Sequence, residues 1–266
     1  MGLFEAIVLA LVEGITEFLP ISSTGHMIVV SSLLEIQKEE FTKLYEVFIQ
    51  FGAILSVVYL YWKRFTKVDN TEFFIKLGIG MIPALILGFL LGDYVDKLLE
   101  SPRTVAISLI VGGVFFLFID TLFRDSVNSV RRISRISRKN AFVIGFWQCL
   151  ALVPGISRSA ASIIGGLQQG LTRQMAAEFS FFLAVPTMLA AATYKTIKVM
   201  IKSPDIMREN LTVLAIGNVV AFIVAVISIR FMMQFVEKYG FKYFGWYRIV
   251  AGLFIFYLLS KGLIVE

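Results

Sequence analysis

Long apolar runs separated by short polar segments form the main pattern of this chain. A helix needs ~20 mostly apolar residues to cross the ~30 Å hydrocarbon core of a bilayer, and hydropathy identifies such helices directly. The pattern predicts six crossing helices, at residues 47–62, 73–91, 105–123, 177–200, 211–235 and 244–259. The predicted fold class is therefore an all-α polytopic membrane protein.

Two further apolar stretches are interrupted before they are long enough to cross. The first holds residues 13–26, where Pro20 breaks the apolar run. Irregular backbone at membrane depth is tolerated only where protein or a water-filled cavity surrounds it. We therefore predict a re-entrant helix pair, which enters, breaks and returns on the same side. Residues 141–153 and 159–169 predict a second pair of this kind.

The two halves of the chain match each other in the same order at a shift of about 135 to 139 residues. The matching segments are residues 21–24 with 156–159 and residues 110–115 with 249–254. Each half, about 1–123 and 141–262, is then a re-entrant pair followed by three spans. Because three crossings reverse the direction of entry, the halves must have opposite orientation, and the two broken tips can meet near the midplane. We predict one integral-membrane domain, residues 1–266, built as an inverted repeat.

Composition and charge narrow the class further. With 58% hydrophobic and 17% charged residues, the chain is not a soluble domain. The net charge of +6 lies in short loops, where it orients the spans, and we expect no nucleic-acid partner. The basic residues Lys63 and Arg64 and the basic segment 124–140 mark one face as cytoplasmic. Both termini and the first re-entrant pair should then lie on the outer side.

Two acids lie within the first re-entrant segment. Glu13 and Glu17 are four residues apart, so a helix places both on one face. Burying two like charges costs several kcal/mol unless a cation or a proton compensates. Carboxylate oxygens together with substrate phosphate oxygens suit Mg²⁺ or Ca²⁺, so both are candidate metal ligands. Pairing with arginines, or protonation of one acid, is the alternative.

Hydroxyl groups and a histidine follow the acids. His26, the only histidine, lies within reach of Ser22, Ser23 and Thr24. A neutral imidazole can accept a hydroxyl proton and return it, so Ser23 and His26 fit a nucleophile and base. The neighbouring hydroxyls are candidate phosphate ligands. Serines after a proline are also ordinary helix caps, and an activated water could attack instead of Ser23.

The second re-entrant segment places Arg158 between Ser157 and Ser159 at a predicted helix start. The guanidinium fork and free N–H groups at a helix N-terminus both bind phosphate oxygens, so all three residues are candidate phosphate ligands. Arg158 could instead serve only as counter-ion to Glu13 or Glu17. We expect it within roughly 10 Å of the two acids, a distance that a hydrated cation and two phosphates could bridge.

Several polar residues in apolar helices have weaker roles. Gln50 and Gln148 are candidates to support the site from a distance. Gly112 and Gly113 fit close helix packing better than phosphate binding. A transporter or lipid flippase remains the main alternative to an enzyme, because inverted repeats with broken helices are typical of transporters. A purely structural scaffold explains the acids and arginine at membrane depth poorly.

Two motifs, EGITEFLPISSTGH at residues 13–26 and PGISRS at residues 154–159, closely resemble those of the bacterial undecaprenyl pyrophosphate phosphatases associated with bacitracin resistance. The resemblance covers essentially the whole chain. One departure follows Ser159, where the family commonly has Gly-Ala-Thr and this chain has Ala-Ala-Ser at residues 160–162, which leaves the role of Ser162 open.

The resemblance implies hydrolysis of undecaprenyl pyrophosphate to the monophosphate and inorganic phosphate in the bacterial plasma membrane. It implies a divalent cation held by Glu13 and Glu17, attack and proton transfer by Ser23 with His26, and phosphate binding by Arg158. The partners are then the lipid substrate and membrane lipids, with a homodimer left open. We expect the site to open toward the outer side.

Overall fold

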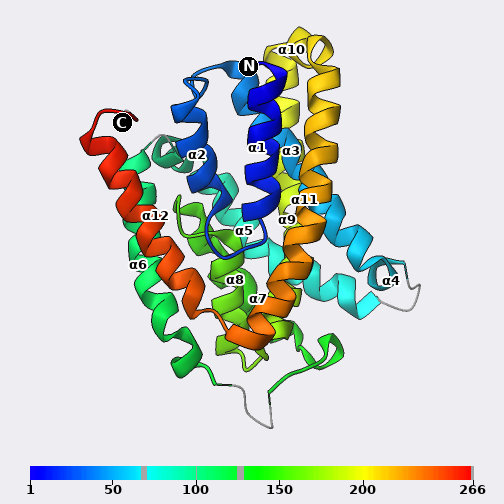
Figure 1. Cartoon of the computed structure of the whole chain (residues 1–266). Helices are drawn as coiled ribbons and strands as arrows, with labels where there is room; N and C mark the ends of the chain where they lie inside the picture. The colour runs from blue at the N-terminus through cyan, green and yellow to red at the C-terminus, as the bar shows by residue number, and fades with distance from the viewer. Residues whose placement is uncertain (67–70, 100, 125–128, 265–266) are drawn as a thin grey trace.

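The computed structural model describes residues 1–66, 71–99, 101–124 and 129–264. Within these ranges the chain forms helices and no β-strand. Six of the described helices are long and apolar enough to cross a membrane, which makes this a multi-pass membrane protein (Figure 1). These are α3 (Glu40–Leu60), α5 (Thr71–Leu99), α6 (Pro102–Leu122), α9 (Arg173–Lys202), α11 (Leu211–Tyr239) and α12 (Lys242–Ser260).

All six predicted crossing helices are confirmed, although α3 begins earlier than predicted. Residues 40–46 are polar enough to suggest a turn, yet Leu44 and Tyr45 are fully buried there. The Tyr45 hydroxyl donates a hydrogen bond to the carbonyl oxygen of Ala6 at 2.7 Å. Packing against the N-terminal helix therefore extends α3 by about two turns beyond the start that hydropathy indicates.

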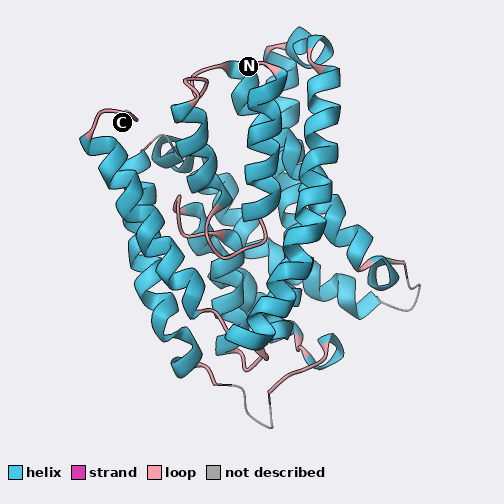
Figure 2. Ribbon diagram, viewed as in Figure 1, coloured by secondary structure: helices cyan, strands magenta, loops and turns pink. Residues whose placement is uncertain are grey.

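Shorter helices complete the described chain. They are α1 (Leu3–Thr16), α2 (Ser23–Leu33), α4 (Trp62–Phe65), η1 (Ile133–Arg135), α7 (Arg138–Gln148), η2 (Cys149–Leu152), α8 (Arg158–Gln168) and α10 (Pro204–Glu209). In Figure 1, α1 and α2 descend from the end that holds both termini, and α7 and α8 come from the other end. Figure 2 shows the loops that join each pair as loop segments in the middle of the bundle.

The helices that carry these loops pack closely on long neighbours. Helix α1 lies on α11 and α7 lies on α5, while α3 packs on α9 and α6 on α12. Glycine permits two of these contacts. A Cβ added at Gly14 of α1 would lie 2.9 Å from the Ala221 carbonyl oxygen, and one at Gly145 of α7 would lie 1.9 Å from that of Gly80. Backbone contact at these crossings packs the short helices tightly on their long neighbours.

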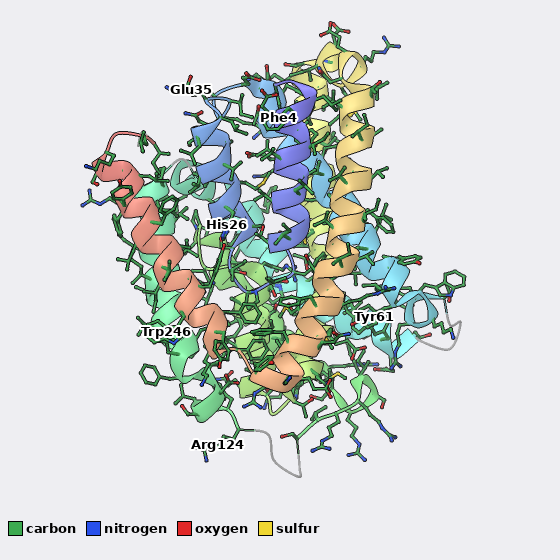
Figure 3. All side chains as sticks on the ribbon, viewed as in Figure 1. Phe4, His26, Glu35, Tyr61, Arg124 and Trp246 are labelled. Carbon is green, nitrogen blue, oxygen red and sulfur yellow. The ribbon has the colours of Figure 1, made fainter. Side chains whose placement is uncertain are left out.

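Polar contacts fix the end of the bundle opposite the termini. Asp120 accepts hydrogen bonds from Arg173 Nε at 2.6 Å and from the Phe241 N–H at 2.8 Å, so it joins α6, α9 and the start of α12. Arg124 lies at this same end in Figure 3. The basic segment 124–140 continues from there, although residues 125–128 lie outside the described part of the chain.

Candidate active site

The first loop begins where α1 ends. The Glu17 N–H donates to the Glu13 carbonyl oxygen at 2.9 Å, so the helical turn continues far enough to place both acids on one face, as their spacing predicts. Ser22 then takes a φ of 72°, a backbone conformation that L side chains rarely adopt. Its Oγ accepts the Gly25 N–H at 3.3 Å, which caps α2.

Glu17 connects two other residues of the predicted site. Its Oε2 accepts a hydrogen bond from Ser23 Oγ at 2.5 Å, and its Oε1 pairs with Arg158 Nη2 at 3.2 Å. The Glu17 side chain is 7% exposed and that of Arg158 is 13% exposed. The predicted proximity of Arg158 to the acidic pair is therefore confirmed for Glu17.

The other nitrogens of Arg158 show how α9 holds the guanidinium. Nη1 donates to the Ser180 carbonyl oxygen at 2.9 Å, and the guanidinium carbon lies 5.7 Å from the ring centre of Phe18. The Ser162 hydroxyl lies 2.7 Å from that of Ser180, which gives Ser162 a supporting role. Arg158 Nε is buried and has no partner among the described residues, so one strong donor stays available.

The second loop repeats the geometry of the first. Ser157 has a φ of 76°, and its Oγ accepts the Ala160 N–H at 3.3 Å to cap α8. Ser159 is fully buried and donates to the Phe18 carbonyl oxygen at 2.9 Å. That hydroxyl ties the two loops together, and its role as a phosphate ligand stays a prediction.

His26 and Ser23, predicted as base and nucleophile, have different hydrogen-bond partners in this structure: Ser23 Oγ bonds Glu17. His26 Nδ1 lies 2.7 Å from the Ser22 carbonyl oxygen, which can only accept, so Nδ1 carries the proton. Its Nε2 lies 2.7 Å from the Tyr247 hydroxyl, and the two rings stack with centres 5.6 Å apart. The Ser22 carbonyl oxygen also accepts the His26 backbone N–H at 3.3 Å. Thr24, also predicted to bind phosphate, is exposed.

The two predicted supporting glutamines lie on α7 and α3. Gln148, at the end of α7, donates from Nε2 to Thr187 Oγ1 at 3.3 Å, and Gln50 is half-buried on α3. In the described part of the chain no hydrogen bond joins either of them to Glu13, Glu17 or Arg158. The spacing of apolar and polar residues cannot tell which neighbour such an amide meets.

Comparison with known proteins decides the family. The model of the family described as "Bacitracin resistance protein BacA" matches residues 6–254. The chain belongs to this family. It is 51% identical to a protein of Flavobacterium johnsoniae over 255 residues, which cover 96% of this chain and 95% of that protein. It is 48% identical to proteins of Porphyromonas gingivalis and of Bdellovibrio bacteriovorus, with 98% of both chains covered in each case. All three are named undecaprenyl-diphosphatase, and the resemblance seen in the motifs is confirmed.

One residue of this BacA family member escaped the sequence prediction. Arg248 of α12 is 1% exposed and donates to four carbonyl oxygens. Nη1 lies 3.0 Å from those of Pro20 and Ile156, while Nη2 lies 3.0 Å from that of Gly155 and 3.2 Å from that of Ser108. The sequence did contain a sign of this role, because Arg248 is an arginine inside an apolar crossing helix. A charge there costs free energy unless hydrogen-bond partners satisfy it.

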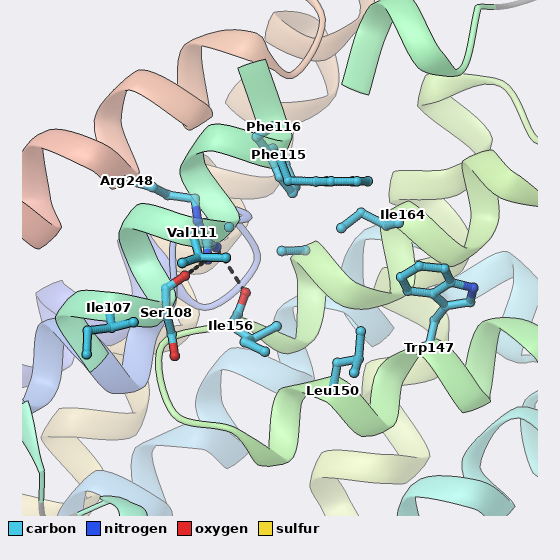
Figure 4. A pocket seen from close by; sticks show the side chains of 12 residues that line it. Ile107, Ser108, Val111, Phe115, Phe116, Trp147, Leu150, Ile156, Ile164 and Arg248 are labelled. Carbon is cyan, nitrogen blue, oxygen red and sulfur yellow. Dashed lines mark hydrogen bonds between the residues drawn. The ribbon is translucent and has the colours of Figure 1, made fainter. Parts of the chain in front are cut away.

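A cavity of about 360 Å³ lies beside Arg248 (Figure 4). Apolar side chains from α6, α7 and α8 line most of it, including Val111, Trp147 and Ile164. Ala160 and Ile164 lie four residues apart on α8, and Ile156 lies two residues before that helix, so the cavity faces one side of α8. Arg158 and Ser162 lie on a different face of α8, and they contact Ser180 rather than the cavity.

The acidic pair fits a divalent cation in part. Glu13 is 2% exposed, and its Oε1 has no partner among the described residues, although a buried carboxylate oxygen normally has one. Glu17 has a bonded partner on each oxygen, but a carboxylate offers about four lone-pair positions. Within the described residues no group of three or more His, Cys, Asp and Glu side chains has metal-binding geometry. The protein would thus supply two carboxylates, and the other ligands would come from phosphate and water.

Proposed function

We propose that this protein hydrolyses undecaprenyl diphosphate to undecaprenyl phosphate and inorganic phosphate. The observation that carries the proposal is the bonding of one buried carboxylate, that of Glu17, to both Ser23 Oγ and Arg158 Nη2. A candidate nucleophile, its base and a guanidinium that can bind phosphate thus meet in one place. The names of the relatives support the lipid, and none of those cited favours a transporter.

An inverted repeat explains how such a site forms inside a bilayer. The two halves would enter from opposite faces as α1 with α2 and as α7 with α8. The packing of α1 on α11 and of α7 on α5 supports this arrangement, because the repeat makes each of these contacts the counterpart of the other. The matching φ values of Ser22 and Ser157 support it too, since both serines begin the second helix of a pair.

Ser23 is the nucleophile in this proposal. A hydroxyl becomes reactive when a base takes its proton at hydrogen-bond distance, and Glu17 Oε2 lies at 2.5 Å. Oγ attacks the terminal phosphorus, its proton passes to Glu17, and the bond from that phosphorus to the bridging oxygen breaks. Undecaprenyl phosphate leaves. One water then hydrolyses the phosphoserine, which restores Ser23 and releases inorganic phosphate.

Arg158 binds the diphosphate and stabilises charge that develops on its oxygens. Positioning and electrostatics supply most of the rate in phosphoryl transfer. The unpartnered Nε of Arg158 is the donor we assign to the substrate, while Nη1 and Nη2 keep the side chain in place. Ser22 and Ser157 accept backbone N–H groups as helix caps, which leaves each hydroxyl proton free to donate to phosphate.

Glu13 and Glu17 would hold Mg²⁺ or Ca²⁺ against the diphosphate. When bound, the cation neutralises phosphate oxygens that would otherwise repel the two acids. The unpartnered Glu13 Oε1 supports this role. His26 keeps Ser22 and the start of α2 in place through its Nδ1 proton, and its Nε2 accepts the hydrogen bond of the Tyr247 hydroxyl.

We place the protein in the bacterial inner membrane with the site open to the outer side. The termini lie at one end of the bundle (Figure 1), and basic residues extend from Arg124 at the other end (Figure 3). Basic loops favour the cytoplasmic side. The first re-entrant pair, which carries Ser23, then enters from outside.

A phosphate-release assay tests the function. Purified protein in detergent should release inorganic phosphate from undecaprenyl diphosphate in a reaction that needs a divalent cation. Glu17→Gln should lower kcat by at least about 100-fold, because it removes the base. Glu72→Gln is the matched control, since Glu72 pairs with Arg138 at an exposed site, and it should keep full activity. No release of phosphate by the wild-type protein would overturn the proposal and favour the alternative, a transporter or lipid flippase.

A further inference from the structure

Arg248 contacts both loops of the site and also α6. We propose that it is a positioning residue that holds the two loops in register, so that Ser23 and Glu17 of the first meet Arg158 of the second. The proposal rests on the proposed function only for what the positioned groups do. Arg248 itself would touch neither the diphosphate nor its terminal phosphorus.

The placement of its four bonds is specific. Arg248 Nη1 spans the loops, because it bonds the carbonyl oxygens of Pro20 and Ile156, both at 3.0 Å. Pro20 lies two residues before Ser22, and Ile156 directly before Ser157. The guanidinium therefore fixes the backbone just ahead of both serines that take positive φ, where each chain turns into its second helix.

Arginine suits this position for a physical reason. Carbonyl groups of irregular backbone at membrane depth find no partner in lipid and must be satisfied by protein or water. Two loops meeting there leave several acceptors close together. Four carbonyls accept from Arg248, which has five N–H donors in a rigid plane, whereas lysine has three on one nitrogen. Lysine would keep the charge but leave at least one carbonyl without a donor.

The neighbouring helix is shaped for this side chain. A Cβ added at Gly112 of α6 would lie 2.3 Å from Arg248 Nη2 and 3.0 Å from Cζ. The guanidinium carbon also lies 5.7 Å from the centre of the Phe116 ring. Gly112, predicted as a helix-packing position, thus gives the guanidinium the space it occupies. Gly112→Ala offers a way to displace Arg248 without changing it.

The contacts across the loops need close tolerance. The ion pair of Glu17 with Arg158 measures 3.2 Å and the bond of Ser159 with the Phe18 carbonyl 2.9 Å. Both fail if one loop slides by an ångström or two. Misplacing reacting groups by about 1 Å can lower the rate about 100-fold. Loss of register should therefore lower kcat strongly and change KM little, because the long apolar tail of the lipid would bind outside the loops.

The experiment compares Arg248→Lys and Gly112→Ala with the wild-type protein in two measurements. The first is phosphate release from undecaprenyl diphosphate, with kcat and KM determined separately. The second is the distance distribution between spin labels at Ile15→Cys and Val153→Cys in a Cys149→Ser background, measured by pulsed electron resonance. Ile15 and Val153 are exposed and flank the first and second loop. This second measurement needs no catalysis.

Asp120→Asn is the matched control, because Asp120 also joins α6 to the start of α12, through a partly buried bond at the end of the bundle opposite the termini. We expect both test variants to broaden the distribution of label distances and to lower kcat about 100-fold, with KM within about threefold of the wild-type value. Asp120→Asn should lower Tm but change neither the label distances nor kcat. A narrow distance distribution in both test variants would overturn the proposal. An equal loss of kcat in Asp120→Asn, when its Tm is lowered as much as in the test variants, would overturn it too. If the wild-type protein releases no phosphate, the proposed function fails, and the label distances still decide the positioning role.

Discussion

Glu17 Oε1 lies 3.2 Å from Arg158 Nη2, and the two residues are 141 positions apart in the chain. One buried ion pair thus connects the acidic loop of the first half with the basic loop of the second. Such pairs tolerate the loss of both partners better than the loss of one, because a single change leaves a buried charge without compensation.

The first prediction concerns the stability of this pair. Glu17→Gln and Arg158→Met should each lower the free energy of unfolding by about 3 kcal/mol, and the double variant by clearly less than the sum. Titration with sodium dodecyl sulfate in mixed micelles measures this cycle. The exposed pair of Glu72 with Arg138 is the control, and its cycle should give no coupling. Additive losses at Glu17 and Arg158 would contradict a coupled buried pair.

The second prediction concerns the nucleophile. Ser23→Ala should lower kcat at least about 100-fold, since covalent attack is lost. Wild-type protein quenched in acid after exposure to substrate labelled in its terminal phosphate should carry label on serine. Ser23→Ala should carry none, whereas Ser31→Ala, which loses a hydroxyl bonded to the Met27 carbonyl farther along α2, should still be labelled. A wild-type protein that turns over without any labelled serine would point to attack by water instead.

Much of the fold follows from hydropathy, because each crossing helix must satisfy its own backbone and present an apolar surface of fixed length. The start of α3 could not be predicted from hydropathy. Tyr45 is buried there by its contact with Ala6, and local composition does not encode that contact. The interrupted segments 13–26 and 154–159 stood out because acids and an arginine at membrane depth need partners.

The bonding pattern within the site could be predicted less well. Spacing placed Ser23 near His26, yet the imidazole bonds the Ser22 carbonyl and Tyr247, 221 residues away. Ser159 likewise meets a backbone carbonyl of the other loop. Backbone acceptors and distant helices decide these contacts. A sequence pattern shows which side chains are polar but not which carbonyl each will face.

The third prediction tests the contact between Tyr247 and His26. Tyr247→Phe keeps the stacked ring but removes the hydroxyl at His26 Nε2. Loss of one hydrogen bond of ~1 kcal/mol should lower kcat by about 3- to 10-fold. Tyr243→Phe, one turn earlier on α12, is the control and should have no effect on phosphate release. Unchanged kcat in Tyr247→Phe would show that the hydrogen bond from Tyr247 to His26 does not support turnover.

The fourth prediction concerns the cation. Removal of divalent ions with a chelator should abolish phosphate release, and Mg²⁺ or Ca²⁺ should restore it. Glu13→Gln should raise the cation concentration for half-maximal activity by at least about 100-fold, because loss of an outer partner alone can cost 10- to 100-fold in affinity. Saturating cation should recover much of kcat, since Glu17 and Ser23 remain in place.

Titration calorimetry of the substrate-free protein measures cation binding apart from turnover. Glu5→Gln, on the same helix but bonded to the Gly2 N–H at its far end, should leave the cation requirement unchanged. Full activity in the chelator would mean that the two acids serve only as partners for arginine and proton, and an unchanged cation requirement in Glu13→Gln would mean that Glu13 is not a ligand.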